Sequence, residues 1–196
     1  MADTDSDNLR DDVELARGTN PTNPDTDNDG LLDGNEVWSQ TWSIDNSPKI
    51  VDRSTISSSI SLPSFTSSTL KPITGLTLYL GIAHTYIGDL YITISHGGKS
   101  AILWNRQGGS ADYIYKSYDL LKMGFTVQDL VSTSAWTLVI EDRAGGDEGR
   151  LEYFDLQVTG GSNPLVRDTD GDGIWDGEEV NLGADGWITN LSLIHI

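Results

Sequence analysis

Three short stretches of this sequence carry a dense row of carboxylates at one fixed spacing. They are DTDSDNLRDDVE at residues 3–14, DTDNDGLLDGNE at 25–36 and DTDGDGIWDGEE at 168–179. Each has aspartate at its positions 1, 3, 5 and 9 and glutamate at its position 12. Like charges this close repel each other. A divalent cation, bound by the hard carboxylate oxygens, would neutralise them.

The spacing is that of a calcium-binding loop of the EF-hand type. Calcium takes about six to eight oxygen ligands, from side chains at alternating positions and from the backbone carbonyl at position 7. Position 6 requires a positive φ, which Gly30 and Gly173 provide and which Asn8 tolerates. Magnesium fits less well, because it seldom uses an all-protein cage of this kind.

The predicted calcium ligands are the five acidic side chains of each loop and the carbonyl group at its position 7. They are Asp3, Asp5, Asp7, Leu9, Asp11 and Glu14; Asp25, Asp27, Asp29, Leu31, Asp33 and Glu36; and Asp168, Asp170, Asp172, Ile174, Asp176 and Glu179. The alternative is an acidic, solvated linker. It applies best to the first loop, where Asn8 replaces glycine and Arg10 brings a positive charge.

The composition excludes several classes of function. The net charge is −18, from 30 acidic and 12 basic residues, which opposes binding to nucleic acid or to an anionic membrane. There is no cysteine, so disulfides, thiol catalysis and cysteine zinc sites are excluded. No apolar run approaches the roughly 18 residues of a membrane span. The sequence has neither a G-x-S-x-G nor an H-E-x-x-H motif, and we predict that it is not an enzyme.

The region between the acidic stretches, about residues 44–160, has the period-two alternation of half-buried strands. The residues predicted to face inward are Leu76, Leu78, Leu80, Ile82, Leu90, Ile92, Ile94, Trp136, Leu138, Ile140, Phe154, Leu156 and Val158. Glycine pairs at 97–98, 108–109 and 145–146 mark turns. The pattern weakens between residues 111 and 133, where we expect longer loops. The predicted fold is all-β, a jelly-roll β-sandwich flanked by calcium loops with little regular secondary structure.

Three phrases in this region resemble one known family. They are HTYIGDLYITI at 84–94, LWNRQGGSADY at 103–113 and WTLVIEDRAGGDEGRLEYFDLQV at 136–158. They resemble the P domain of proprotein convertases, also called the homo B domain. The resemblance implies a β jelly roll next to the catalytic domain of a protease or within a surface protein. The family usually has tryptophan near the last strand, where this chain has Tyr153 and Phe154.

The P-domain resemblance also implies a calcium ion among the loops of the jelly roll. Its ligands would be Asp89, Asp112 and Asp142, and the alternative is that these aspartates cap turns. His84 has no partner in a metal-ligand or nucleophile pattern, so we interpret it as a structural residue.

The segments around the acidic loops resemble bacterial thrombospondin type 3 repeats. The segments are ELARGTNPTNPDTDNDGLLDGNEV at 14–37 and GSNPLVRDTDGDGIWDGEEVNLGADGWITN at 161–190. Proline so close before a loop excludes the full incoming helix of an EF-hand. A dockerin shares the loop and a similar repeat interval. However, it should have an apolar, helical second half, which this sequence lacks.

We predict four segments. Residues 1–43 are calcium repeats, 44–160 are the jelly roll, and 161–190 are a further calcium repeat. The last six residues, LSLIHI, can be back-translated into CTG-TCT-CTT-ATA-CAC-ATC, which resembles a transposon end used in DNA library preparation. We therefore predict that residues 191–196 are an adapter read as protein, and that the chain is a fragment of a longer one.

The leading hypothesis is a calcium-binding, non-catalytic accessory or spacer region of a larger secreted or cell-surface protein, such as a protease. Its partners would be calcium ions and the catalytic or adhesion domains of the parent chain. A second hypothesis is an adhesion module that binds carbohydrate or protein through Tyr113, Tyr115 and Tyr118. A third is a hydrolase with paired carboxylates.

Overall fold

The computed structural model describes residues 2–44, 46–63, 73–169, 171 and 173–180. The chain forms two compact units. The acidic unit comprises the described parts of Met1–Ser39, Ser68–Thr74 and Thr159–Ile196, and the β unit comprises those of Gln40–Ser67 and Gly75–Val158. No helix in these described ranges is long and apolar enough to cross a membrane.

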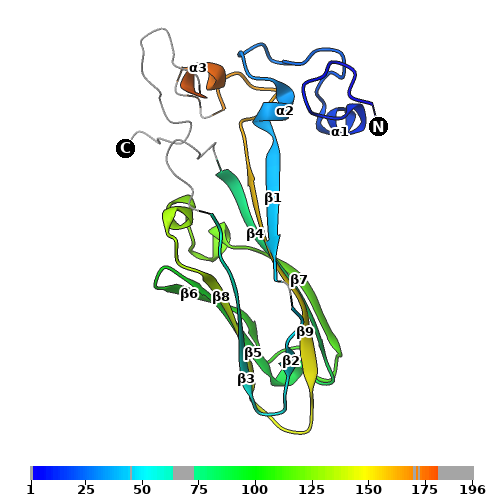
Figure 1. The fold of residues 1–196 in the computed structure, drawn as a ribbon, viewed down its shortest axis with the longest axis vertical. Coiled ribbons are helices and arrows are strands. Elements are labelled where there is room, and N and C mark those ends of the chain that lie inside the picture. The colour runs from blue at the N-terminus through cyan, green and yellow to red at the C-terminus, as the bar shows by residue number, and fades with distance from the viewer. Residues whose placement is uncertain (1, 45, 64–72, 170, 172, 181–196) are drawn as a thin grey trace. The chain divides into compact units, whose positions relative to one another are not determined.

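Two antiparallel sheets form the β-sandwich (Figure 1). In the first sheet the order is β1 (Trp38–Ser43), β9 (Gly149–Gly160), β4 (Ile73–His84) and β7 (Tyr113–Asp119), and β2 (Lys49–Ile50) also pairs with β9. In the second sheet the order is β3 (Thr55–Ile60), β8 (Trp136–Asp142), β5 (Leu90–His96) and β6 (Lys99–Asn105). The short 3-10 helices η1 (Ile87–Asp89), η2 (Leu121–Met123) and η3 (Val127–Val131) lie in connections. The predicted all-β sandwich is thus confirmed.

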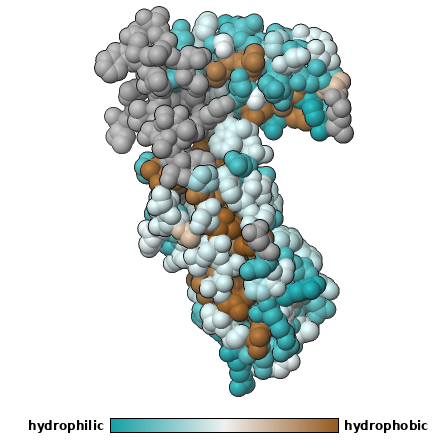
Figure 2. Space-filling model, viewed as in Figure 1, coloured by the Kyte–Doolittle hydropathy of each residue, from teal (hydrophilic) through white to brown (hydrophobic). Residues whose placement is uncertain are grey.

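All of the predicted inward-facing residues lie in the core of the β unit. Leu76, Leu78, Leu80, Ile82, Leu90, Ile92, Ile94, Trp136, Leu138, Phe154, Leu156 and Val158 are 0% exposed, and Ile140 is 1% exposed. In the register of the second sheet, Ile92 pairs with Ile140 and Ile94 pairs with Leu138. Apolar residues on the visible face of the β unit lie in a band bordered by hydrophilic residues (Figure 2).

The expectation of longer loops between residues 111 and 133 is only partly met. Strand β7 lies there and pairs with β4 from Thr77↔Asp119 to Ala83↔Tyr113. Its sequence, YIYKSYD, hides the strand pattern because the exposed positions on either side of the buried Ile114 carry the aromatic residues Tyr113 and Tyr115. The helices η2 and η3 occupy the rest of the segment.

The alternation in β9 is interrupted once. Leu151 and Phe154 are both buried, so the two residues between them, Glu152 and Tyr153, are both partly exposed. Glu152 accepts a hydrogen bond from the hydroxyl of Tyr115, and the Tyr153 ring stacks on that of Tyr115. Both side chains therefore lie on the outer face of the first sheet.

The helices of the acidic unit are short, and each begins at position 9 of an acidic loop. They are α1 (Asp11–Arg17), α2 (Asp33–Glu36) and α3 (Asp176–Val180). Helix α1 ends at Gly18, whose φ of 91° supplies the left-handed conformation that usually stops a helix. Helices this short are not stable by themselves in water. Their stability therefore depends on the loops.

The core assignment predicts the effect of a large-to-small substitution. Phe154→Ala should lower the free energy of unfolding by about 3–5 kcal/mol, because it leaves a cavity between the sheets. Urea unfolding in calcium, followed by circular dichroism of the β-sheet, measures this cost. Ile102→Ala, at a side chain that is 51% exposed, is the matched control and should change it by less than about 0.5 kcal/mol. Equal costs for the two variants would contradict the assignment.

Candidate metal-binding loops

Each acidic loop is closed by the same pair of residues, a threonine at position 2 and the aspartate at position 9. Thr26 donates to Asp33 from its backbone N–H over 2.8 Å and from its hydroxyl over 2.6 Å. Thr4 and Asp11 form the same two bonds at 2.8 and 2.7 Å. Thr169 and Asp176 form them at 2.8 and 2.5 Å. Sequence reasoning missed this role, although threonine follows the first aspartate in all three loops.

The backbone of each loop takes a positive φ at positions 4 and 6. The values are 64° at Ser6 and 76° at Asn8, 61° at Asn28 and 101° at Gly30, and 79° at Gly171 and 95° at Gly173. The positive φ predicted at position 6 is confirmed, and Asn8 adopts it as glycine does. The two left-handed residues curl the chain, so that alternate side chains point toward the same space.

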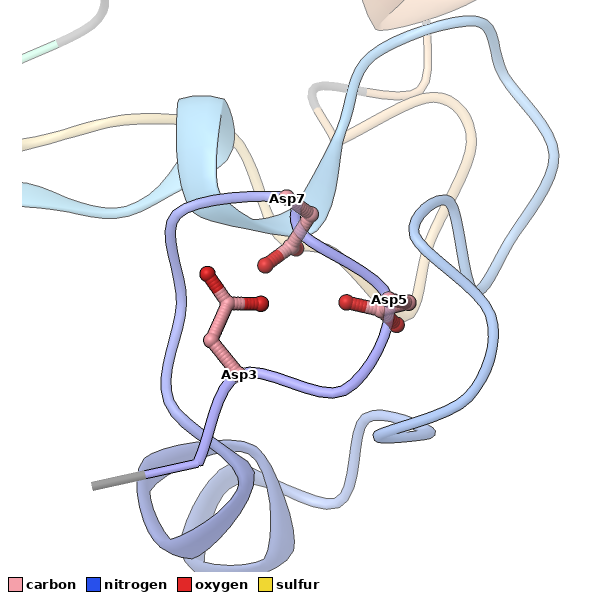
Figure 3. Close-up of side chains that lie close together, drawn as sticks. All are labelled: Asp3, Asp5 and Asp7. Carbon is pink, nitrogen blue, oxygen red and sulfur yellow. The ribbon is translucent and has the colours of Figure 1, made fainter.

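The carboxylates at positions 1, 3 and 5 form one cluster in each of the first two loops. Asp3, Asp5 and Asp7 point into the space that their loop encloses (Figure 3), and their oxygens lie within 4.8 Å of one another. Asp25, Asp27 and Asp29 form the equivalent cluster. In the third loop, Asp168 accepts hydrogen bonds from the N–H groups of Gly171 and Gly173 at 2.7 and 2.8 Å. Asp170 and Asp172 lie outside the described residues.

A second cluster joins consecutive loops. Asp7 and Glu14, at positions 5 and 12 of the first loop, lie within 4.8 Å of Asp33, which is at position 9 of the second loop. Positions 5 and 12 of the second loop meet position 9 of the third in the same way, through Asp29, Glu36 and Asp176. All six residues are at most 5% exposed. The structure therefore places the position-9 aspartate with the preceding loop as well as with its own threonine.

Close backbone contact accompanies this second cluster. The N–H of Gly34 donates to Asp7 over 2.9 Å, and that of Gly177 donates to Asp29 over 3.1 Å. A Cβ at Gly34 would lie 2.3 Å from the carbonyl oxygen of Asp7, and one at Gly177 would lie 2.2 Å from that of Asp29. Only glycine therefore fits position 10 of a loop that packs on a preceding one. The first loop has the exposed Asp12 there, paired with Arg10.

The predicted carbonyl ligands at position 7 lie next to the clusters. The N–H of Leu9 donates to Asp7 over 2.6 Å, and the N–H of Leu31 donates to Asp29 over 2.7 Å. These bonds hold position 7 against the position-5 carboxylate in each of the first two loops. Ile174, at position 7 of the third loop, is half-buried.

Buried carboxylate oxygens without hydrogen-bond partners test whether the clusters fit a cation. Both oxygens of Glu14 and of Asp5, one of Glu36 and one of Asp27 are buried in this way. A buried polar atom is normally hydrogen-bonded, and a buried charge is normally paired or bound to a metal. Hard oxygens around an enclosed space are the donor set of calcium. The residues present therefore fit the ion.

Burial and mutual repulsion also raise the pKa values of the carboxylates in these clusters. Burial, followed by repulsion from Asp5 and Asp7, raises the pKa of Glu14 to about 7. Burial raises the pKa of Glu36 to about 8, although the hydroxyl of Ser162 donates to its Oε1 over 2.8 Å and opposes the rise. Burial, followed by repulsion from Asp29, raises the pKa of Asp27 to about 6. Without a cation, therefore, Glu14 and Glu36 resist ionisation at neutral pH, and Asp27 does so only in more acidic solution.

The second and third loops are neighbours although about 130 residues separate them in the sequence. Besides the bond from Gly177 to Asp29, Nε of Arg167 donates to the carbonyl of Asp27. The Arg167 guanidinium also lies 5.2 Å from the ring centre of Trp175. The acidic loops before and after the β unit thus form one continuous array.

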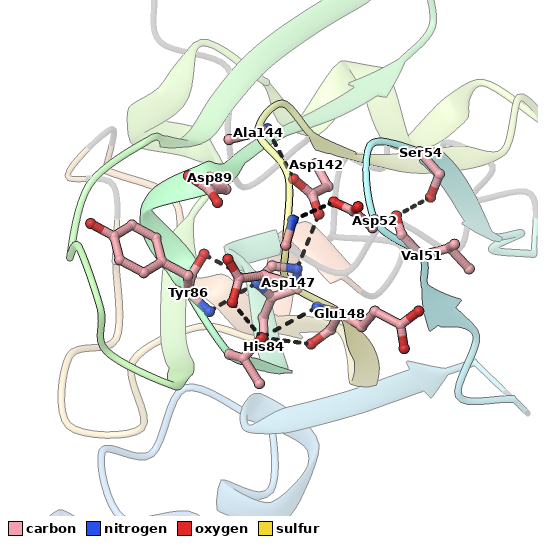
Figure 4. A network of polar contacts seen from close by, with 12 residues as sticks. Val51, Asp52, Ser54, His84, Tyr86, Asp89, Asp142, Ala144, Asp147 and Glu148 are labelled. Carbon is pink, nitrogen blue, oxygen red and sulfur yellow. Dashed lines mark hydrogen bonds and ion pairs between the residues drawn. The ribbon is translucent and has the colours of Figure 1, made fainter.

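The loops at one end of the β unit contain the other predicted ligands, of which Figure 4 shows Asp89 and Asp142. His84 Nε2 lies 3.4 Å from Oδ2 of Asp142, and both side chains are fully buried. The His84 Nδ1 accepts the N–H of Tyr86 at 3.2 Å, and Asp142 Oδ1 accepts that of Ala144 at 3.1 Å. Nε2 of His84 and Oδ2 of Asp142 are buried without a hydrogen-bond partner, so the structural role that the sequence context assigns to His84 stays a prediction.

The three aspartates of this region are not brought together as one ligand group. The carboxylate of Asp89 lies 3.8 Å from the guanidinium of Arg106, and Asp112 is exposed. Asp89, Asp112 and Asp142 are absent from the carboxylate groups that lie within 4.8 Å of one another in the described ranges. A calcium ion at these residues stays a prediction.

Comparisons with known protein families assign most of the chain. Residues 73–158 match the family model of the proprotein convertase P-domain. Residues 3–24, 25–38 and 168–185 match that of the bacterial TSP3 repeat, the thrombospondin type 3 repeat. Both resemblances inferred from the sequence are thus confirmed.

Two curated relatives are each named "Calcium-dependent protease", one from Nostoc sp. and one from Trichormus variabilis. Each is 32% identical over 94 residues, which are 45% of this chain and 14% of the relative. The chain therefore matches only a small part of their length. A solved structure of the Aeromonas sobria serine protease with its chaperone is 14% identical, with a TM-score of 0.35, over 76% of this chain and 29% of that one.

The raised pKa values predict a pH dependence for the ion-free protein. The pKa of about 7 at Glu14 and about 8 at Glu36 exceed the ordinary value of 4.5. Their contribution to stability is therefore fully present below pH 4.5 and is lost as the pH rises through 7 to 8. In chelator, the unfolding temperature of the acidic unit should fall between pH 5 and pH 8.5, as measured by scanning calorimetry.

Substitutions show which carboxylates cause the fall in unfolding temperature as the pH rises. Glu14→Gln and Glu36→Gln should each flatten the pH dependence, because they remove a titrating group from a buried cluster. Asp12→Asn is the matched control, because Asp12 is exposed and its hydrogen bond from Arg10 lowers its pKa. If both Gln variants show the same dependence of unfolding temperature on pH as the wild type, Glu14 and Glu36 are not the groups responsible.

Proposed function

Because the chain combines a proprotein convertase P-domain with bacterial TSP3 repeats, we propose that it is a calcium-ordered, non-catalytic accessory region of a larger extracellular protein. One observation carries the calcium proposal: Glu14 is 0% exposed and neither of its carboxylate oxygens has a hydrogen-bond partner. Such a group is stable in a fold only when it is protonated or bound to a cation.

We propose one calcium-binding unit for each loop. In the first loop its ligands are Asp3, Asp5, Asp7, Leu9 and Glu14, with Asp33 contributed by the second loop. The second loop has the equivalent set Asp25, Asp27, Asp29, Leu31 and Glu36, with Asp176 from the third. In the third loop the ligands are Asp168, Ile174 and Glu179, together with Asp170 and Asp172 outside the described residues. Asp11 closes the first loop through Thr4.

The function of the ion follows from the cluster that joins the loops. Ion binding to folded but not to unfolded chain adds directly to the folding free energy. Asp29, Glu36 and Asp176 come from loops on opposite sides of the β unit in the sequence. An ion in the second loop therefore holds the third loop, and one divalent ion per loop would reduce the net charge from −18 to about −12.

The extracellular environment suits such loops. Extracellular modules bind calcium with dissociation constants of about 10⁻⁴–10⁻³ M, which match the millimolar calcium outside cells. In a calcium-poor compartment the carboxylates would repel each other and the loops would lose their order. We therefore propose a secreted or cell-surface protein.

A protease is the favoured parent. The relatives that share 94 residues with this chain are named calcium-dependent proteases, and this chain corresponds to 14% of their length. P-domains and TSP3 repeats are accessory modules, so we assign no catalytic residue to the chain. Residues 1–43, 44–160 and 161–190 would then be a calcium strip, the P-domain region and a second calcium strip, and 191–196 would be the adapter.

Calcium titration of the whole chain tests this function. Thermal unfolding should shift upward with calcium, and each independent site should add about 2.7 kcal/mol at 100 times its Kd. Isothermal calorimetry gives the number of ions, and magnesium should replace calcium poorly because it rarely uses an all-protein cage. Unchanged unfolding and no heat of binding would refute the proposal.

Two variants show whether the buried cluster holds the ion. Glu14→Gln should weaken calcium binding in the first loop by at least about tenfold, because it removes a charged ligand from a desolvated site. Asp12→Asn, two residues earlier and exposed, is the matched control and should bind calcium as the wild type does. Equal binding by both variants would place the ion elsewhere.

A further inference from the structure

Three tyrosines form a row of rings on the outer face of the first sheet. The ring centres of Tyr113 and Tyr115 are 5.6 Å apart with planes 11° from parallel. Those of Tyr115 and Tyr153 are 6.2 Å apart with planes 9° from parallel. Tyr113 is 57% exposed and Tyr115 is 56% exposed. Tyr118, which the sequence groups with Tyr113 and Tyr115, faces the other way, and its hydroxyl is buried.

The backbone under this row is shaped to receive it. Gly81 in β4 pairs with Tyr115 in β7. A Cβ at Gly81 would lie 2.2 Å from the ring of Tyr153, so the ring occupies the space that any other residue would fill. The alternation of β9 breaks at Glu152 and Tyr153, and Glu152 accepts a hydrogen bond from the hydroxyl of Tyr115 at 2.7 Å. Two local irregularities, a glycine inside β4 and this break in the alternation of β9, thus hold one aromatic row.

The row continues into a cavity of about 640 Å³, of which Tyr113 forms part of the wall. The cavity also has hydroxyl groups from Ser47 and Thr85 and two charges of each sign. The basic residues are Lys49 and Arg150 and the acidic residues are Asp112 and Glu148, and Lys49 and Glu148 form an ion pair of 2.6 Å. The cavity is therefore balanced in charge, although the chain as a whole carries −18.

We propose that the tyrosine row and this cavity bind a neutral polysaccharide. Exposed, nearly parallel tyrosines offer rigid apolar contact area with little loss of conformational entropy, and they keep a polar hydroxyl at their tips. The flat apolar face of a sugar ring packs on such a ring, and the sugar hydroxyls pair with the charged and hydroxyl groups of the cavity.

The charge distribution selects this ligand among those that stack on aromatic rings. The bases of single-stranded nucleic acid also stack on tyrosine. However, a phosphate polymer is repelled by a protein of net charge −18, and so is an acidic polysaccharide. A basic peptide would be drawn to the acidic loops rather than to a surface whose charges balance. A neutral, hydroxyl-rich polymer remains.

Affinity electrophoresis of the whole chain in calcium tests the proposal. Native gels would contain hydroxyethylcellulose, mixed-linkage β-glucan, galactomannan or soluble starch as neutral probes. Polygalacturonate, heparin and gelatin are the acidic and protein comparisons. At least one neutral polysaccharide should retard the wild type. Tyr113→Ala and Tyr115→Ala should each weaken that retardation by about tenfold, the loss expected for one stacking ring.

Two further variants separate a binding defect from misfolding. Tyr91→Ala removes a half-buried tyrosine from β5, in the other sheet, and should leave retardation unchanged. Gly81→Ala keeps all three tyrosines but displaces the Tyr153 ring, and should weaken retardation. Calorimetry confirms that each variant unfolds as the wild type does in the β unit. The proposal is overturned by retardation in heparin or gelatin alone, by none in any neutral gel, or by equal retardation of wild type and both exposed-tyrosine variants.

Discussion

The acidic unit buries carboxylates that no other protein group pairs with, and the rest of this unit depends on that constraint. Positions 5 and 12 of a loop and position 9 of the next are buried together, and Glu14 carries two unpartnered oxygens. A fold that buries like charges is unfavourable unless a cation or a proton neutralises them. Burial and repulsion between the carboxylates raise the pKa of Glu14 to about 7 and that of Glu36 to about 8. A bound calcium ion would balance these charges without protonation.

The same constraint explains how the loops are connected. The threonine at position 2 fixes the position-9 aspartate, and that aspartate then faces the preceding loop. Glycine at position 10 allows the backbones to meet, as at Gly34 and Gly177. Asp33 of the second loop thus completes the cluster of the first, and Asp176 of the third completes that of the second, so an ion bound at either would order the loop that follows. Because the second and third loops flank the β unit in the sequence, the array joins chain segments that are far apart.

The β unit achieves stability by a different route. Its core is a sandwich of alternating apolar residues, and among its described residues His84 and Asp142 form a fully buried contact, with Nε2 of His84 3.4 Å from Oδ2 of Asp142. The irregular features of this unit, Gly81 within β4 and the break in the alternation of β9 at Glu152 and Tyr153, contribute little to the core and instead shape the outer face. Local irregularity without a packing benefit is a mark of a binding surface.

Periodicity along the chain was enough to establish the acidic loops and the core strands, although strand β7 escaped it. The spacing of carboxylates identified the loops, Gly30 and Gly173 identified the positive φ at position 6, and the alternation around Leu78, Ile92 and Leu156 identified the core strands. All of these features depend on residues that are close in the sequence, so a fixed residue period can encode them. Only the tertiary structure decided that Asp33 and Asp176 join the preceding loops, and that Tyr153 rather than Tyr118 stands beside Tyr115. Those neighbours depend on long-range pairing and on a break in the alternation of β9, and neither leaves a period in the sequence.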